Sequence, residues 1–172
     1  MNYIFLDVDG VLNSQKYMIK THKKLKKILK NKTESEMIYA TRHVDTKAVY
    51  RLSKIVKATN AKIIMSSSWR GAWKYGEPST NNYTAFYLNS VMHNFGIAVD
   101  DITTLVYHDR GEQILQYVFE NLKPEDNWIV IDDEIFDIDR YISLDKVVKT
   151  NFKTGLLNKH IKEAILKMRK QK

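Results

Sequence analysis

The hydrophobic positions of this chain fall into short continuous runs separated by longer stretches with helical spacing. Four apolar runs predict buried strands, and they cover residues 3–8, 61–65, 128–131 and 146–150. The first run is apolar on both faces apart from its acids, as expected of a central strand in a parallel sheet. Two shorter β-like pieces are expected at residues 97–99 and 104–107.

The stretches between these runs repeat their apolar residues with the period of an α-helix. The predicted helices cover residues 15–31, 45–58, 83–94, 111–121 and 155–170, with loops or a small hairpin at 32–44 and a loop at 71–82. Strands that alternate with helices of this length indicate right-handed βαβ units. The expected fold class is therefore α/β: a three-layer, Rossmann-like, mainly parallel sheet with helices on both faces.

Length and composition narrow the class of protein. A chain of 172 residues is expected to form one domain, and 44% apolar residues fit a folded globule. The absence of cysteine excludes a disulfide scaffold, a cysteine zinc site and a thiol nucleophile. Asp7 interrupts the N-terminal apolar run too early for a signal peptide, and no apolar run is long enough to span a membrane. We expect a cytoplasmic protein without a membrane partner, and the oligomeric state stays open.

The net charge of +8 (28 basic minus 20 acidic residues) is unevenly distributed. Residues 16–32 hold eight lysines and no acid, and residues 159–172 are again basic. Five acids gather within residues 132–139. A basic surface around a cluster of acids indicates an anionic substrate that binds next to a metal ion. The alternative is that the lysine runs are only solvated faces.

Two pairs of carboxylates follow predicted strands. Asp7 and Asp9 are two residues apart, so at the strand period they share one face, and Gly10 then allows a sharp turn. Asp132 and Asp133 follow the run 128–131. Because the carboxyl ends of parallel strands meet at one edge of a sheet, these acids should lie together and repel one another unless a cation binds. Mg²⁺, which prefers oxygen ligands, is the expected cofactor. The alternative is that each pair only caps a helix or a turn.

The same residues resemble the motifs of a known family. Residues 5–13 (FLDVDGVLN) resemble the opening motif of the haloacid dehalogenase-like (HAD) phosphohydrolases, and residues 63–66 (IIMS) resemble the second motif. Arg110 stands where the third motif has a basic residue, and residues 129–133 (IVIDD) resemble the fourth, with Asp137 as its trailing acid. The resemblance covers about residues 1–150. It is closest to the small HAD domains associated with RNA repair, which carry a similar Ser-Ser-Trp-Arg after the second strand.

The resemblance implies a role for each matching residue. Asp7 would attack phosphorus and form an aspartyl-phosphate, and Asp9 would act as general acid and then general base. Ser66 would donate a hydrogen bond to a phosphoryl oxygen, and Arg110 would neutralise the charge that develops there. The implied Mg²⁺ site comprises Asp7, Asp9 (also through its backbone carbonyl), Asp132 and Asp133, with Asp133 preferred over Asp132 as the direct ligand.

Four further residues are expected to contact the substrate: Gly10, Ser67, Trp69 and Arg70. Arg70 could hold a second anionic group and Trp69 could stack on a base. The alternative is that Trp69 only packs and that Arg70 is a surface cation.

Residues 14–44 occupy the place where HAD proteins carry a flap or small cap, within one HAD-like domain at residues 1–172. This insertion is too short for a large cap domain, so the site should be open to large substrates. Its lysines favour a polyanion as partner.

These observations lead to three functional hypotheses. The first is a Mg²⁺-dependent phosphomonoester hydrolase that acts on nucleotide or nucleic-acid terminal phosphates. The second keeps the chemistry and replaces the substrate with a small metabolite phosphate. The third is a catalytically inert nucleic-acid-binding module, against which the retention of all four acids argues.

Overall fold

A five-stranded parallel sheet forms the centre of the molecule. The computed structural model describes residues 1–28, 44–74, 77–78, 83–106 and 109–170. The spatial order of the strands is β5 (Asp101–Ile102), β2 (Ala61–Met65), β1 (Asn2–Leu6), β6 (Asn127–Asp132) and β7 (Val147–Lys149). Leu6 pairs with Met65 on one side and with Ile131 on the other. The carboxyl ends of the three central strands are therefore level with one another.

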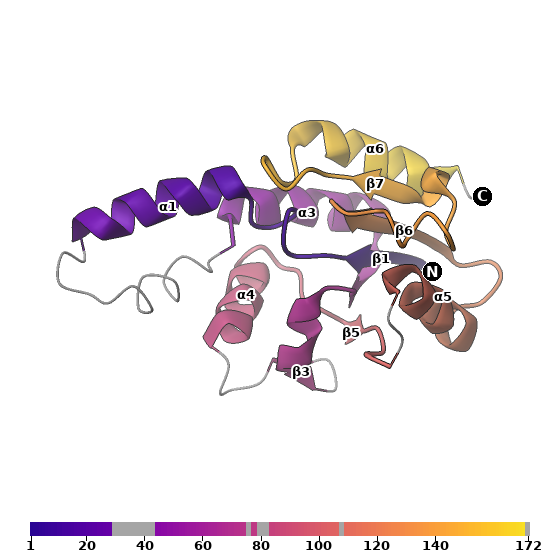
Figure 1. Ribbon diagram of the computed structural model, residues 1–172. Helices are drawn as coiled ribbons and strands as arrows, with labels where there is room; N and C mark the ends of the chain where they lie inside the picture. Colours follow the sequence, from indigo (N-terminus) through magenta and orange to yellow (C-terminus); the bar gives the residue numbers. More distant parts are fainter. Residues whose placement is uncertain (29–43, 75–76, 79–82, 107–108, 171–172) are drawn as a thin grey trace.

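Alternate residues of the strands face two separate cores. Ile4 and Leu6 point into a core that they share with α3 (Thr46–Thr59), α4 (Tyr83–Asn94) and α6 (Asn158–Arg169). Tyr3 and Phe5 point into a second core that includes Ile114 of α5 (Arg110–Asn121). Figure 1 shows α3 and α6 on the opposite side of the sheet from α5. The predicted three-layer α/β fold with a parallel sheet is confirmed.

Most predicted elements agree with the structure to within a few residues. The strand at 61–65 and the helix at 83–94 agree at both ends. The last helix begins at Asn158, not at residue 155, because the chain at Gly155 (φ +68°) first passes close to Val11. A Cβ atom at Gly155 would lie 3.0 Å from the Val11 carbonyl oxygen.

The two short β-like pieces were predicted wrongly. Residues 97–99 are an irregular connection whose apolar residues, Ile97 and Val99, are buried in the first core. Residues 104–106 form no strand, and residue 107 lies outside the described part. At residues 97–99 the apolar alternation reflects burial without strand pairing, whereas Leu105 and Val106 of the second piece are exposed. The edge strand β5 instead consists of Asp101 and Ile102.

Part of the predicted loop at 71–82 has regular structure. A 3₁₀ helix, η1 (Ser68–Ala72), follows β2, and the strands β3 (Trp73–Lys74) and β4 (Glu77–Pro78) pair antiparallel. A second 3₁₀ helix, η2 (Leu144–Lys146), precedes β7. Residues 75–76 and 79–82 lie outside the described part. The side chain of Ser67 caps η1 by accepting a hydrogen bond from the Trp69 amide.

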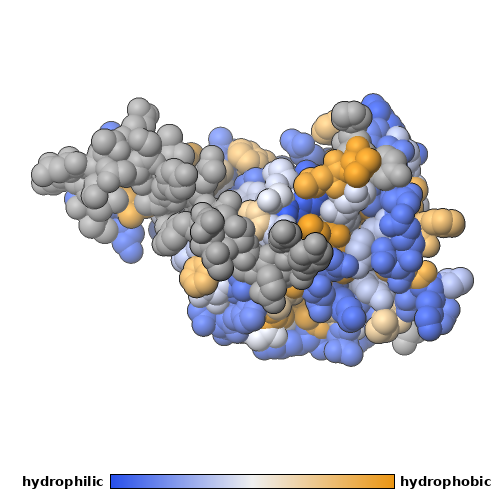
Figure 2. Space-filling model, turned by 90° about the horizontal axis from the view of Figure 1, so that it is seen from below, coloured by the Kyte–Doolittle hydropathy of each residue, from blue (hydrophilic) through white to orange (hydrophobic). Residues whose placement is uncertain are grey.

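The predicted basic helix at 15–31 is present as α1 (Gln15–Ile28), and the rest of the predicted flap, residues 29–43, lies outside the described part. No residue from 15 to 27 is buried, and in Figure 1 α1 projects away from the sheet. On the face shown in Figure 2, hydrophilic residues predominate among the coloured ones. Among the described helices, none has the length and apolar character needed to cross a bilayer.

Gly111 tests the packing between α5 and the segment that follows β6. A Cβ atom at Gly111 would lie 2.8 Å from the Asp137 carbonyl oxygen and 2.8 Å from a ring carbon of Tyr141. We expect Gly111→Ala to lower the free energy of unfolding by about 1–3 kcal/mol, because backbone must move to make room. Chemical denaturation measures this loss. The control is Gly71→Ala, where nothing lies within 4 Å of the new Cβ. Equal stability of the two variants would contradict the packing argument.

Candidate active site

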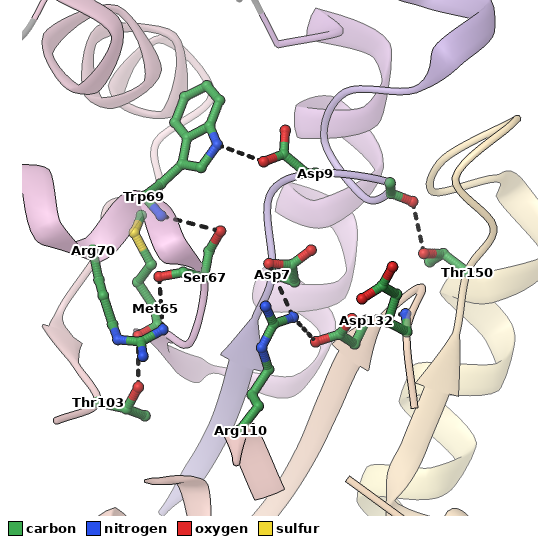
Figure 3. A network of polar contacts seen from close by, with 12 residues as sticks. Asp7, Asp9, Met65, Ser67, Trp69, Arg70, Thr103, Arg110, Asp132 and Thr150 are labelled. Atoms are coloured by element: carbon green, nitrogen blue, oxygen red, sulfur yellow. Dashed lines mark hydrogen bonds and ion pairs between the residues drawn. The ribbon is translucent and has the colours of Figure 1, made fainter. Parts of the chain in front are cut away.

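The acidic residues gather at the carboxyl ends of the central strands (Figure 3). Asp7 directly follows β1, and its backbone N–H donates to the Ile131 carbonyl at 3.0 Å. Asp132 is the last residue of β6. The exposed fraction is 4% for Asp7 and 0% for Asp132. Two carboxylates are thus held beside each other, away from water, by the backbone of the sheet.

Arg110 bridges these two carboxylates from the start of α5. Its Nη1 lies 3.2 Å from Asp7 Oδ1 and 2.5 Å from Asp132 Oδ2. Its backbone N–H donates to Asp137 Oδ2 at 2.7 Å, so Asp137 fixes the beginning of the helix that carries the guanidinium. Burial alone would lower the pKa of Arg110, but Asp132 and Asp7 together raise it. Arg110 therefore remains a cation in this position.

The single guanidinium does not compensate the buried acids. Burial raises the pKa of Asp7 to about 8, with a further increase from Asp132 that outweighs the attraction of Arg110. Burial also raises the pKa of Asp132 to about 6, although Arg110 opposes this shift. Carboxyl groups in this arrangement ionise together only when more positive charge is present.

A metal ion fits this charge deficit. Asp7, Asp132 and Asp133 each offer one oxygen, and these three oxygens lie within 4.8 Å of one another. An all-oxygen donor set suits a hard cation such as Mg²⁺. Both oxygens of Asp132 are already engaged, by Arg110 and by the Glu134 amide. Asp133 makes no ion pair within the described part of the chain, which favours it over Asp132 as a direct ligand.

Gly10 makes room for Asp133. Its φ is +70°, and a Cβ atom there would lie only 2.1 Å from Asp133 Cγ. The Gly10 carbonyl accepts a hydrogen bond from Thr150 Oγ1 at 2.8 Å, which joins the loop to the end of β7. Gly10 was expected to contact substrate, and the structure places the Asp133 carboxylate against it.

Asp9 lies apart from the three converging acids. Its Oδ1 accepts a hydrogen bond from Asn13 Nδ2 at 2.7 Å, and its Oδ2 accepts one from Trp69 Nε1 at 2.9 Å. In Figure 3 the Asp9 carboxylate points toward Trp69. Its carboxylate oxygens are not in the group formed by Asp7, Asp132 and Asp133, and the expected contact of its backbone carbonyl with the metal stays a prediction.

The segment after β2 brings Ser67, not Ser66, to Asp7. A hydrogen bond from the Ser67 side chain stabilises the charged form of Asp7 and so opposes the rise in its pKa. The Ser66 backbone N–H donates to the Leu6 carbonyl at 2.9 Å. The Ser66 hydroxyl is fully buried and has no partner within the described part of the chain.

Arg70 is buried, so its interpretation as a surface cation is wrong. Its Nη1 donates to the Ser67 carbonyl at 2.8 Å and its Nη2 donates to Gln113 Oε1 at 2.5 Å. Arg70 thereby connects the segment that carries Ser67 with α5, where Gln113 lies three residues after Arg110.

Sequence reasoning missed Gln113, and it also missed Asn13 and Thr150. Of these, Thr150 could have been found, because it follows the fourth strand.

Fold and site together define a protein of the HAD class, in which acids stand at the carboxyl ends of central parallel strands. The family model described as "HAD domain in Swiss Army Knife RNA repair proteins" matches residues 3–161, and the chain belongs to this family. The match confirms the resemblance seen in the motifs and extends it into α6. Family membership indicates phosphatase-type hydrolase chemistry. No curated protein and no solved structure matches the chain significantly.

The fit between Gly10 and Asp133 can be tested with a matched pair of glycines. Gly10→Ala should displace the Asp133 carboxylate and weaken Mg²⁺ binding at least about tenfold, because one ligand moves. Gly96→Ala is the control: its φ is also +70°, but nothing lies within 4 Å of its new Cβ. Both variants carry similar backbone strain. Calorimetric titration with Mg²⁺ measures the affinity, and equal affinities in the two variants would count against Asp133 as a ligand.

The raised pKa of Asp7 predicts a gain in stability on its replacement. Between the ordinary pKa of 3.8 and about 8, folded Asp7 holds a proton that the unfolded chain has released, so its contribution to stability falls as the pH rises. Metal-free Asp7→Asn should therefore melt about 3–6 °C above the metal-free parent near pH 7. The difference should shrink toward about pH 4. Thermal unfolding across this range measures it, and a lower melting temperature for Asp7→Asn would contradict the prediction.

Proposed function

We propose that this protein is a Mg²⁺-dependent phosphomonoester hydrolase that works through an aspartyl-phosphate on Asp7. The observation that carries the proposal is the convergence of Asp7, Asp132 and Asp133 around Arg110 at the ends of β1 and β6. Such a cluster is unfavourable by itself and becomes favourable when a divalent cation and an anionic phosphoryl group share it.

Two displacements would complete the reaction. In the first, an Asp7 oxygen forms a bond to phosphorus while the ester bond breaks and Asp9 gives its proton to the leaving oxygen. In the second, Asp9 takes a proton from water as the water oxygen attacks phosphorus and releases Asp7. Arg110 would stabilise the charge on the phosphoryl oxygens, since its fork of N–H donors can engage two of them. Ser67, whose side chain contacts Asp7, is a nearby hydroxyl donor. Ser66 remains the donor that the family resemblance implies for a phosphoryl oxygen.

The metal would be held by Asp7, Asp132 and Asp133, with the Asp9 carbonyl as a further expected ligand. When bound, Mg²⁺ would neutralise the acids and draw the phosphoryl group toward Asp7. The chain's own residues supply the nucleophile, the proton and the orientation.

We propose terminal phosphates of nucleotides or nucleic acids as the substrate class. The description of the family supports this, because its members belong to RNA repair proteins. The helix α1 supports it as well, since it carries six lysines and no acid. Lys16, Lys20, Lys23 and Lys27 follow a helical spacing that puts them on one side of α1, over a rise of about 16 Å. That rise spans about five nucleotide steps of one strand.

Two alternatives share parts of this proposal. A small-metabolite phosphatase would use the same acids without α1, and an inert nucleic-acid-binding module would use α1 without the acids.

The nucleophile is tested with Asp7→Asn in the presence of Mg²⁺. Hydrolysis of p-nitrophenyl phosphate should fall about 10³-fold or more, because no group is left to form the covalent intermediate. The control is Asp145→Asn, an exposed acid within η2, which should keep full activity. Release of inorganic phosphate measures both. Unchanged turnover in Asp7→Asn, with the fold intact, would refute the proposed mechanism.

The substrate class is tested by removing positive charge from α1 and, as a control, from α6. Lys16, Lys20 and Lys23 are replaced together by Gln, and the control replaces Lys159, Lys162 and Lys170, which are exposed on or beside α6. Both variants lose the same charge. Only the α1 variant should lose kcat/KM on a 5′- or 3′-phosphorylated oligonucleotide. For this variant, the slope of log(kcat/KM) against log[salt] should become less negative by about 2. Hydrolysis of p-nitrophenyl phosphate should be unchanged in both. A small-metabolite phosphatase would show no difference between the two variants on any substrate.

A further inference from the structure

We propose that Trp69 is a positioning residue for Asp9, whose carboxyl group its indole N–H holds in place for proton transfer to the leaving group. This inference rests on the proposed function, in which Asp9 is the general acid. It assigns Trp69 a role that differs from the base stacking expected from the sequence.

The first observation is the pair of hydrogen bonds on Asp9. Trp69 Nε1 donates to Oδ2 at 2.9 Å, and Asn13 Nδ2 donates to Oδ1 at 2.7 Å. Each oxygen of the carboxylate thus has one N–H donor, and Figure 3 shows the indole edge facing Asp9. Two donors, one on each oxygen, restrict the rotation of the carboxyl group about its bond to Cβ.

The second observation is that both donors are themselves held firmly. The Trp69 ring packs against the core shared with α3 and α4, and its backbone N–H donates to Ser67 Oγ at 3.4 Å. Asn13 is 2% exposed, and its backbone N–H donates to the Val8 carbonyl at 3.2 Å. A ring that packs against the core and donates its N–H to Asp9 can hold that acid in one orientation.

The third point is chemical. Each carboxyl oxygen has two lone pairs, so one N–H on each oxygen leaves a second lone pair that can carry the transferred proton. Indole and amide N–H groups are neutral, so they orient Asp9 without forming an ion pair with it. As Asp7 forms its bond to phosphorus and the ester bond breaks, the Asp9 O–H bond breaks and its proton joins the leaving oxygen. Correct placement of that oxygen raises the rate of this step.

This role predicts an effect that depends on the leaving group. A p-nitrophenolate ion departs readily without a proton, whereas an alkoxide needs one. Loss of acid positioning should therefore slow the hydrolysis of an alkyl phosphate and hardly affect p-nitrophenyl phosphate. A residue that only supports the fold or binds the phosphoryl group would affect both esters equally.

The experiment uses Trp69→Phe, which keeps an aromatic ring and removes the N–H donor. We expect kcat/KM with Mg²⁺ to fall about tenfold for glycerol phosphate and to stay within about twofold for p-nitrophenyl phosphate. This parameter reports the first displacement, in which Asp9 acts as acid. Asp9→Asn should show the same preference with a larger loss. Asn13→Ala removes the other donor, should repeat the pattern, and serves if Trp69→Phe does not fold.

The matched control is Trp73→Phe. The Trp73 indole N–H is also buried, but it has no hydrogen-bond partner within the described part of the chain. Its replacement should change the ratio of the two kcat/KM values by less than about twofold, whatever it does to the melting temperature.

Three results would overturn the inference. Equal losses on the two esters in Trp69→Phe would make Trp69 a packing or substrate-stacking residue, and no loss on either would make its hydrogen bond irrelevant to catalysis. Equal losses in Asp9→Asn would remove Asp9 as the acid. These results leave the proposed function standing as long as the parent protein hydrolyses both esters. A parent protein that hydrolyses neither ester would overturn the proposed function together with the inference.

Discussion

Repulsion between buried carboxylates is the constraint on which the site depends. Asp7 and Asp132 are forced together because each ends a strand, and the two strands are neighbours in register. The backbone hydrogen bond from Asp7 to Ile131 prevents either acid from moving away. Sheet pairing and two apolar cores therefore provide the free energy that keeps like charges adjacent. Burial of both carboxyl groups is the main cause of their raised pKa values, and Asp132 raises the pKa of Asp7 further.

Around this centre, each charged group is held by a separate contact from the surrounding loops. Asp137 fixes the start of α5 and so the position of Arg110, while the Glu134 amide holds Asp132. Arg70 joins the Ser67 segment to α5 through Gln113. Asp137 follows β6 and Arg70 follows β2, so the position of α5 is set by residues from two other segments. The site is consequently a property of the assembled sheet and not of any single motif.

The sequence predicted the sheet, its helices and the convergence of Asp7, Asp132 and Asp133, because apolar periodicity and strand ends are local signals. It did not predict that the Asp9 carboxylate would bind Asn13 and Trp69 instead. It could not predict that the Ser67 side chain would contact Asp7, since that depends on the turn into a 3₁₀ helix. It left open whether Arg70 is a surface cation, because the burial of a guanidinium depends on partners such as the Ser67 carbonyl and Gln113, which the sequence pattern does not identify. The strand at 97–99 failed for a related reason: burial in a core and pairing in a ladder leave the same apolar alternation.

The helix α1 leaves the body directly beside the loop that carries Asp9 and Asn13. None of its residues from 15 to 27 is buried, so tertiary packing contributes little to it, and a free helix of fourteen residues is only marginally stable in water. Its six lysines repel one another along that length. Neutralisation by a polyanion would relieve the repulsion and favour the helical state. The helix–coil equilibrium of α1 and the binding of a polyanion to its lysines are thereby thermodynamically linked.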